Sequence, residues 1–309
     1  MGSREGRAII VSIVIITKDT RELLKGCLRS IEKDTSLRSL GIETIIIDNA
    51  SNDGTDSMVR QEFPDALYIR NDVNTGFAAA VNRAGHVARG KYILLLNSDT
   101  LLIEGEAAKM VGFADSMDNL GILGPQLVYD DLSTQRSVAP IPRLTGEILP
   151  GSQRLRRNDL SRDVVDVESL IGAAILIRKS AFDDINGFDE RFFFFLEETD
   201  FCMRLRLAGY RVVFYPSARV VHLQGKTVRK NWIKGRMEYN ISLRKFIRKH
   251  HGSLYGLLFD SVKCTKALLF ILFTPFLLFG EHSRLRYLYY CKLVDWYFSG
   301  CPDSFGLRN

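Results

Sequence analysis

Two short polar stretches of this 309-residue chain have the residue types and spacing of a reaction site. Asn97-Ser98-Asp99 directly follows the apolar run YILLL, and Glu197, Glu198 and Asp200 follow the apolar run at 192–196. A carboxylate at the end of a core strand can bind a divalent cation. Carboxylates crowded beside an apolar wall have raised pKa values, which suits a general base. These stretches therefore predict metal-assisted chemistry with a carboxylate base.

Both stretches also have purely structural interpretations. Asn-Ser-Asp-Thr can form only a turn or a helix cap. Acidic residues in a first helical turn can simply complement the helix dipole, and Asp200 and Arg204 have the i,i+4 spacing of an ion pair. His222 ends a β-branched strand, where a lone histidine is more often structural. As a ligand, its neutral imidazole suits Mn²⁺ better than Mg²⁺.

The first hundred residues alternate strand and helix patterns. Strands are predicted at 9–16, 43–47, 67–70 and 91–96, and helices at 23–31, 55–63 and 76–89. Strands that are apolar throughout predict an α/β fold with a mainly parallel sheet buried on both faces. Ligands of such sheets bind beyond the carboxyl ends of the strands, where the polar stretches 17–19, 48–53 and 97–99 fall.

The familiar nucleotide-binding loops are absent from the sequence. Neither G-x-G-x-x-G nor G-x-x-x-x-G-K-[ST] follows a predicted strand. A bound phosphate would instead need a carboxylate-held metal ion for neutralisation. The second half predicts strands at 121–128, 169–177, 211–215 and 219–222, a helix at 197–208, and a polar surface excursion at 130–166.

The C-terminal segment differs in charge from the rest of the chain. Residues 226–309 carry 15 Lys and Arg against 5 Asp and Glu, whereas residues 1–225 carry 27 against 31. A basic helix is expected at 231–250, and the uncharged run 267–280 is short and interrupted by Pro275. Flanking basic and aromatic residues favour an element at a membrane interface. A buried core helix, a homodimer interface or another anionic partner stays open, but no nucleic-acid-binding module is recognisable.

The cellular compartment is predicted from the cysteines and the N-terminus. The five cysteines are scattered, with no C-x-x-C pair, which favours a reducing compartment. The segment MGSREGRAII lacks the apolar run of a secretory signal. We expect a cytoplasmic protein.

Six ordered motifs carry a family resemblance that covers about residues 9–225. They are SIVIITKD, IIIDNASNDGT, NTGFAAAVNRA, YILLLNSDT, GAAILIRKSAFDDINGFDERFFFFLEETDFCMRLRLAGY and VVHLQG. Together they resemble the inverting GT-A family 2 glycosyltransferases, especially bacterial rhamnosyltransferases and galactofuranosyltransferases. The resemblance implies a Rossmann-like GT-A catalytic domain at residues 1–225, with a mainly parallel sheet flanked by helices, and a C-terminal helical extension at 226–309.

The resemblance implies the reactive groups. Asp99 corresponds to the last residue of an Asp-x-Asp motif that binds Mg²⁺ or Mn²⁺ on the donor diphosphate, and Asn97 replaces the first carboxylate by an amide. His222 corresponds to a histidine that approaches the metal or the diphosphate. Glu198 corresponds to the general base, a position where Asp is more frequent, and Glu197 is the second choice.

The resemblance also implies the nucleotide-sugar site. Asp48 matches a residue that hydrogen-bonds the base or ribose, Thr17 and Asp19 line the base pocket, and Asn97 faces ribose or phosphate. Residues of the segment covering the nucleotide are Asn74, Gly76, Phe77 and Asn82. Segments 172–174 and 192–195 are expected beside the sugar and acceptor.

The expected function is transfer of a sugar from a nucleotide-diphosphate donor, with dTDP-rhamnose as the first candidate. The expected acceptor is a glycan linked to polyprenyl diphosphate, at the inner face of the cell membrane, in cell-surface polysaccharide synthesis. Asn97 keeps open a catalytically degenerate carbohydrate- or nucleotide-binding scaffold. A sugar nucleotidyltransferase is disfavoured because TKDTRELL is not its glycine-rich basic loop.

Overall fold

The computed structural model describes residues 8–149, 164–223, 232–273 and 281–308. The chain divides into two compact units, which are described separately. The sheet unit contains residues 1–141, 155–190 and 198–226, and the helical unit contains residues 142–154, 191–197 and 227–309. The helical unit thus includes two segments that precede the predicted boundary at residue 225.

The sheet unit is built on one large mixed sheet. The strand order is β3-β2-β1-β4-β10-β6-β11-β5, and β8 pairs with β11. The strands are β1 (Val11–Thr17), β2 (Ile42–Asp48), β3 (Leu67–Arg70), β4 (Tyr92–Asn97), β5 (Thr100–Leu102), β6 (Leu120–Val128), β8 (Val165–Asp166), β10 (Ala174–Arg178) and β11 (Arg211–His222). A second small sheet pairs β7 (Val138–Ala139) with β9 (Ser169–Leu170).

The four strands predicted in the first hundred residues form the parallel half of the sheet. Strand β1 pairs in parallel with both β2 and β4, and β2 with β3. The second half supplies the antiparallel part of the predicted mainly parallel sheet, because β10 runs antiparallel to its neighbours β4 and β6. This reversal brings the beginning of β10 to the edge where β4 ends, with Ala174 opposite Leu96.

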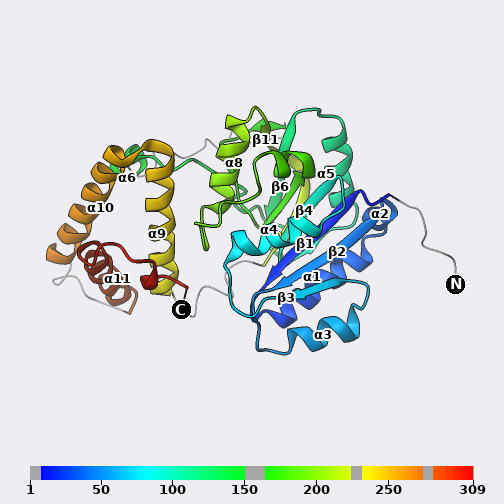
Figure 1. Ribbon diagram of the computed structural model, residues 1–309, viewed down its shortest axis with the longest axis horizontal. Helices are drawn as coiled ribbons and strands as arrows, with labels where there is room; N and C mark the ends of the chain where they lie inside the picture. Colours follow the sequence, from blue (N-terminus) through cyan, green and yellow to red (C-terminus); the bar gives the residue numbers. More distant parts are fainter. Residues whose placement is uncertain (1–7, 150–163, 224–231, 274–280, 309) are drawn as a thin grey trace. The chain divides into compact units, whose positions relative to one another are not determined.

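Helices cover both faces of the sheet, as the alternation along β1 requires. Ile13 and Ile15 belong to one apolar core, together with residues of α1, α2, α3 and α5. Val14 and Ile16 belong to the other, with residues of α4, α7 and α8 (Figure 1). The helices are α1 (Arg21–Lys33), α2 (Thr35–Ser39), α3 (Thr55–Glu62), α4 (Phe77–Val87), α5 (Glu106–Asp115), α7 (Lys179–Asp184) and α8 (Glu197–Leu207).

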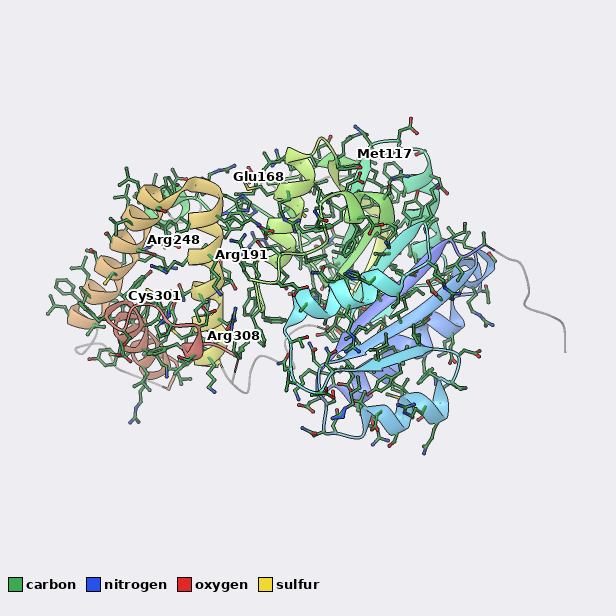
Figure 2. All side chains as sticks on the ribbon, in the orientation of Figure 1. Met117, Glu168, Arg191, Arg248, Cys301 and Arg308 are labelled. Carbon is green, nitrogen blue, oxygen red and sulfur yellow. The ribbon has the colours of Figure 1, made fainter. Side chains whose placement is uncertain are left out.

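The helical unit has its own small core. It comprises α6 (Leu144–Ile148), α9 (Trp232–His251), α10 (Ser253–Phe273), α11 (Glu281–Phe298) and the 3₁₀ turn Asp303–Phe305. Residues of α9, α10 and α11 pack around Trp296, which is 1% exposed. Asp260 on α10 accepts hydrogen bonds from Arg244 and Arg248 on α9, each at 2.9 Å, and Figure 2 shows Arg248 on that helix.

The C-terminal predictions are only partly tested. The predicted basic helix is confirmed by α9. The uncharged run 267–280 coincides with the end of α10 up to Phe273, and residues 274–280 lie outside the described part of the chain. Among the helices that the structure describes, none is both long enough and apolar enough to cross a membrane.

Candidate active site

Strand register brings the predicted site residues to one edge of the large sheet. Thr17 is opposite Asp48 in the β1–β2 pair, and Ile16 is opposite Asn97 in the β1–β4 pair. The amide of Asn97 donates to the carbonyl of Ala173, just before β10, at 2.8 Å. The loop at 171–173 is therefore next to the end of β4, and the position of segment 172–174 beside the sugar stays a prediction.

Asp99 and His222 meet because β5 and β11 pair antiparallel. His222 is opposite Thr100 in this pair, and the amide of Leu223 donates to the carbonyl of Asp99 at 2.9 Å. Nε2 of His222 lies 3.5 Å from Oδ1 of Asp99, and both side chains are nearly buried. The carboxylate of Asp99 makes no hydrogen bond to any residue within the described part of the chain.

Ser98, between Asn97 and Asp99, turns into the protein. Its hydroxyl accepts a hydrogen bond from Thr20 at 2.9 Å, and the Thr20 hydroxyl is 2.8 Å from that of Thr17. Ser98 is 9% exposed. This hydroxyl chain ties the ends of β1 and β4 together and holds the turn that presents Asp99.

Gln135 is a site residue that the sequence interpretation missed. It lies in the segment predicted only as a surface excursion, yet it is 7% exposed. Its Oε1 is 3.1 Å from Nδ1 of His222, and its Nε2 donates to the carbonyls of His222 at 2.5 Å and Val128 at 3.3 Å. The amide therefore holds both the backbone and the ring of His222.

The pair Asp99 and His222 fits a divalent cation that is shared with a substrate. Nε2 of His222 and Oδ1 of Asp99, 3.5 Å apart, are close enough for both atoms to contact one cation. Among the residues that the structure describes, no group of three His, Cys, Asp or Glu side chains is arranged to hold a metal. A cation bound by one carboxylate, one imidazole, water and phosphate oxygens matches this donor set.

Glu198, the second residue of α8, lies beside the 171–173 loop. A methyl group added at Gly172 would lie 3.4 Å from Cβ and Cγ of Glu198, so the glycine leaves room for this side chain. Burial raises the pKa of the Glu198 carboxyl, and hydrogen bonds from the backbone amides of Glu198, Gly172 and Thr199 offset part of the rise. Its Oε2 is shielded from water and has no hydrogen-bond partner among the described residues. A carboxylate in this setting can accept a proton.

The other carboxylates of the acidic stretch have different surroundings. Asp200 is fully buried, and Arg204 donates to it at 2.8 Å, which confirms the expected i,i+4 pair. Arg204 also donates to the carbonyls of Ile185 and Gly187. Glu197 is buried at the start of α8. Asp200 is therefore a structural carboxylate, and the roles of Glu197 and Glu198 as bases stay predictions.

The chain makes a strained turn immediately before the acidic pair. Phe195 and Leu196 have φ values of 70° and 64°, a left-handed conformation that bulky residues rarely adopt. In the helical unit, the carbonyl of Phe194 accepts from the hydroxyl of Ser242 on α9 at 2.9 Å, and the Phe195 ring packs edge-on against Tyr239. Such strain costs about 1–3 kcal/mol per residue and clusters at functional sites.

Asp48 is fully engaged within the protein. It is 0% exposed, its Oδ1 accepts from the amide of Ser51 at 2.8 Å, and its Oδ2 accepts from the hydroxyl of Tyr68. Next to it, the buried Asn49 donates to the carbonyl of Gly76 and accepts from Asn71 at 2.7 Å. Asp48 shapes the end of β2, and its predicted contact with a nucleotide stays a prediction.

Thr17 and Asp19 lie in the loop that leaves β1. Thr17 is buried, and Asp19 is left-handed with φ 50°. The Asp19 carboxylate accepts from the amide of Asn52 at 2.7 Å and is 3.0 Å from the amine of Lys18. These bonds join the loops after β1 and β2, so that both loops border one surface at the sheet edge.

The segment expected to cover the nucleotide has two parts. Asn74 accepts from the amide of Gly76, whose φ of 86° requires glycine, and Phe77 begins α4 with a half-buried side chain. Asn82 is 8% exposed and grips Phe188: its Nδ2 donates to the carbonyl and its Oδ1 accepts from the amide. Asn82 thereby anchors the loop that leads toward the acidic stretch. Its predicted nucleotide contact is untested.

Comparisons with known sequences found two matching family models and several relatives. A sequence model described as "Glycosyl transferase family 2" matches residues 12–185, and one described as "N-terminal domain of galactosyltransferase" matches residues 157–226. An N-acetylglucosaminyl-diphospho-decaprenol L-rhamnosyltransferase of Mycobacterium tuberculosis is 29% identical over 203 residues, covering 59% of this chain and 66% of that protein. A rhamnosyltransferase of Escherichia coli K12 is 24% identical over 229 residues, covering 69% of this chain and 83% of that protein.

A solved structure supports the fold. A mannosyltransferase from Pyrobaculum calidifontis, in complex with GDP-mannose and Mn²⁺, superposes with a TM-score of 0.58 at 16% identity, covering 95% of this chain and 87% of that chain. The predicted GT-A fold and the predicted resemblance to rhamnosyltransferases are both confirmed. Since the first sequence model alone accounts for more than half of the residues, this chain belongs to glycosyl transferase family 2.

Proposed function

We propose that this protein transfers rhamnose from dTDP-rhamnose to a glycan linked to polyprenyl diphosphate, with inversion at the anomeric carbon. The observation that carries the proposal is the convergence of Asp99, His222 and Glu198 on one sheet edge. The names of the mycobacterial and Escherichia coli relatives support a rhamnosyl donor, and that of the mycobacterial relative supports a lipid-linked acceptor.

Asp99 and His222 would hold a divalent cation, Mg²⁺ or Mn²⁺, through one carboxylate oxygen and Nε2. Bound there, the cation supplies positive charge that stabilises the departing diphosphate. The Mn²⁺ in the solved mannosyltransferase complex supports this assignment. Asn97, at the end of β4, contributes an uncharged amide that can donate to a ribose or phosphate oxygen.

Glu198 is the proposed general base. Its carboxylate takes the proton from an acceptor hydroxyl while that oxygen attacks the anomeric carbon. The new carbon–oxygen bond forms on the face opposite the diphosphate, and the old bond breaks with its electron pair leaving on the diphosphate. The buried, water-shielded Oε2 supports this role, because a raised pKa brings a carboxylate closer to the basicity that proton transfer at neutral pH needs.

The helical unit is proposed to bind the membrane that carries the lipid-linked acceptor, from the cytoplasmic side. Helix α10 exposes seven large apolar side chains, in one group near its start and another near its end: Leu254, Leu257, Leu258, Leu268, Leu269, Leu272 and Phe273. Exposed basic side chains of the same unit include Lys266, Arg284, Arg286 and Lys292. Apolar area beside positive charge is the combination that binds an anionic interface.

The activity test uses a donor panel. The full chain is assayed with dTDP-rhamnose, UDP and GDP sugars on a polyprenyl-diphosphate-linked N-acetylglucosamine acceptor, with Mg²⁺, with Mn²⁺ and with chelator. Transfer from dTDP-rhamnose that requires metal, with inverted product by NMR, is expected. Nucleotide-sugar binding without turnover under every condition would instead favour the scaffold function that Asn97 keeps open.

The membrane test uses sedimentation with vesicles. The wild type is expected to bind vesicles rich in phosphatidylglycerol and to bind neutral phosphatidylcholine vesicles less. Leu268→Ser combined with Leu272→Ser should reduce binding. The matched control is Leu207→Ser, an exposed leucine at the end of α8 that should bind like the wild type. Equal binding by all variants would refute the role of α10.

A further inference from the structure

The amide of Gln135 has only one orientation that satisfies its surroundings. Its Nε2 lies 2.5 Å and 3.3 Å from two backbone carbonyl oxygens, those of His222 and Val128. A carbonyl oxygen can only accept, so the NH₂ group must face these two atoms. Oε1 is then the atom that faces Nδ1 of His222, at 3.1 Å.

This orientation determines which ring nitrogen of His222 carries the proton. Oε1 of an amide can only accept, so Nδ1 must be the donor. In the neutral imidazole, Nε2 is then the bare nitrogen, and it lies 3.5 Å from Oδ1 of Asp99. That separation exceeds the usual 2.7–3.2 Å of an N–H···O hydrogen bond. Two electron-rich atoms therefore face each other, an arrangement that a cation stabilises.

We propose that Gln135 is a positioning residue that holds His222 in the Nδ1–H tautomer, with Nε2 free to bind the divalent cation beside Asp99. The tautomer part of the inference depends only on this hydrogen-bond network. The metal part rests on the proposed function. Histidine ligands of metals commonly donate their second nitrogen to an acceptor in this way, and loss of that acceptor typically lowers metal affinity about 10–100-fold.

The segment that carries Gln135 is held firmly on both sides. The backbone amide of Gln135 donates to the carbonyl of Leu127 at 2.8 Å, and the backbone carbonyl of Gln135 accepts from the side chain of Gln126 at 2.7 Å. Thr134 bridges to Val128 across the turn. The hairpin after β6 therefore presents the Gln135 side chain to the end of β11, which β6 itself pairs with.

A purely structural role for Gln135 would look different. Tying the hairpin to β11 needs only the NH₂ group and the carbonyl of His222. It does not require Oε1 to face a ring nitrogen, and it would leave the tautomer of His222 unconstrained. The tautomer is thus the property that separates the two roles.

The first experiment is ¹⁵N NMR of histidine-labelled wild-type protein at about pH 8, where an ordinary imidazole is neutral. Comparison with His222→Gln assigns the signal. The expected coupling pattern is that of an Nδ1–H imidazole, and addition of Mn²⁺ alone should broaden the His222 signal more than those of the other histidines. An Nε2–H pattern in the wild type would overturn the proposal, whether or not any sugar is transferred.

The second experiment compares two Gln→Leu variants by Mn²⁺ titration. Gln135→Leu should populate both tautomers and weaken Mn²⁺ binding about 10–100-fold. The matched control is Gln126→Leu, because Gln126 bonds the same hairpin through the carbonyl of Gln135 and the hydroxyl of Ser137 but does not contact His222. The control should keep the wild-type tautomer and affinity. Equal weakening in both variants would mean that only the fold of the hairpin matters.

Discussion

The two halves of the sheet edge use their polar side chains in opposite ways. At the ends of β1, β2 and β3, the polar groups bind one another: Asp48 is held by Ser51 and Tyr68, and Asn49 by Asn71 and Gly76. At the ends of β4 and β11, Asp99 faces His222 without a hydrogen bond. Buried polar groups are normally satisfied, so we expect a ligand beside Asp99 and His222, at the ends of β4 and β11, which we call the open half of the edge. The ends of β1, β2 and β3, which we call the closed half, build the loops that frame it.

The comparison predicts the largest effect for the proposed base. Glu198→Gln should lower kcat about 10²–10⁴-fold, because an amide of the same shape cannot accept the acceptor's proton. Donor binding, measured by calorimetry, should stay close to wild type. Glu22→Gln is the control, since Glu22 is exposed on α1. A Glu198→Gln variant with near-normal kcat would move the base to Glu197.

The second-largest effect is expected for Asp99, the carboxylate in the open half of the edge. Asp99→Asn should lower turnover about 10²–10³-fold, since it removes charge at the point where the diphosphate develops negative charge. Excess Mn²⁺ should recover part of the loss if the residual site still binds metal weakly. The measurement is kcat/KM against Mn²⁺ concentration. A variant with unchanged metal dependence would show that Asp99 is only a turn residue.

Substitutions in the closed half should lower the unfolding free energy of the protein. Tyr68→Phe removes the hydroxyl that donates to the buried Asp48, and an unsatisfied buried acceptor costs about 1–3 kcal/mol of unfolding free energy. Urea unfolding measures the loss, with Tyr129→Phe as an exposed control that should change little. If Tyr68→Phe raises the KM for the donor without loss of stability, Asp48 belongs to the binding surface and the division into closed and open halves fails.

The smallest predicted effect is a gain of stability with a defined pH dependence. Burial raises the folded-state pKa of Glu198. Folding therefore favours the protonated form of this carboxyl, and the wild-type protein loses stability as pH rises through the folded-state pKa. Glu198→Gln, which stays neutral, should be more stable than wild type by about 1 kcal/mol near neutral pH. The difference should vanish toward pH 4, as thermal unfolding at several pH values would reveal.

The order of elements was predictable, and so were the strand ends. Apolar strands such as β1 and β4 are bounded by polar residues, so the sequence locates Asp99 at a strand end without a structure. The direction of β10 was not predictable, because its apolar pattern is the same for parallel and antiparallel pairing. Short elements such as β5 were not predicted, because three residues are too few to show an alternation of apolar and polar side chains.

Whether the role of a side chain could be predicted depends on how close in the sequence its partners lie. The setting of Glu198 was predictable from the adjacent apolar run. Gln135 was not, because its contact with His222 spans 87 residues and depends on a hairpin register that no local pattern encodes. Asn82 had a signal that was missed: it lies four residues after Ala78, on the buried face of α4. That spacing favours an anchoring role.

The position of β5 has a consequence for the order of synthesis and folding. This short strand pairs with β11 at the end of the sheet's strand order, and β11 begins more than a hundred residues later in the chain. A nascent chain that has reached residue 210 contains Asp99 but lacks the strand against which its turn is aligned. Non-local pairings of this kind form late and slowly. The Asp99–His222 pair should therefore assemble in one of the last folding steps, after most of the parallel half of the sheet has formed.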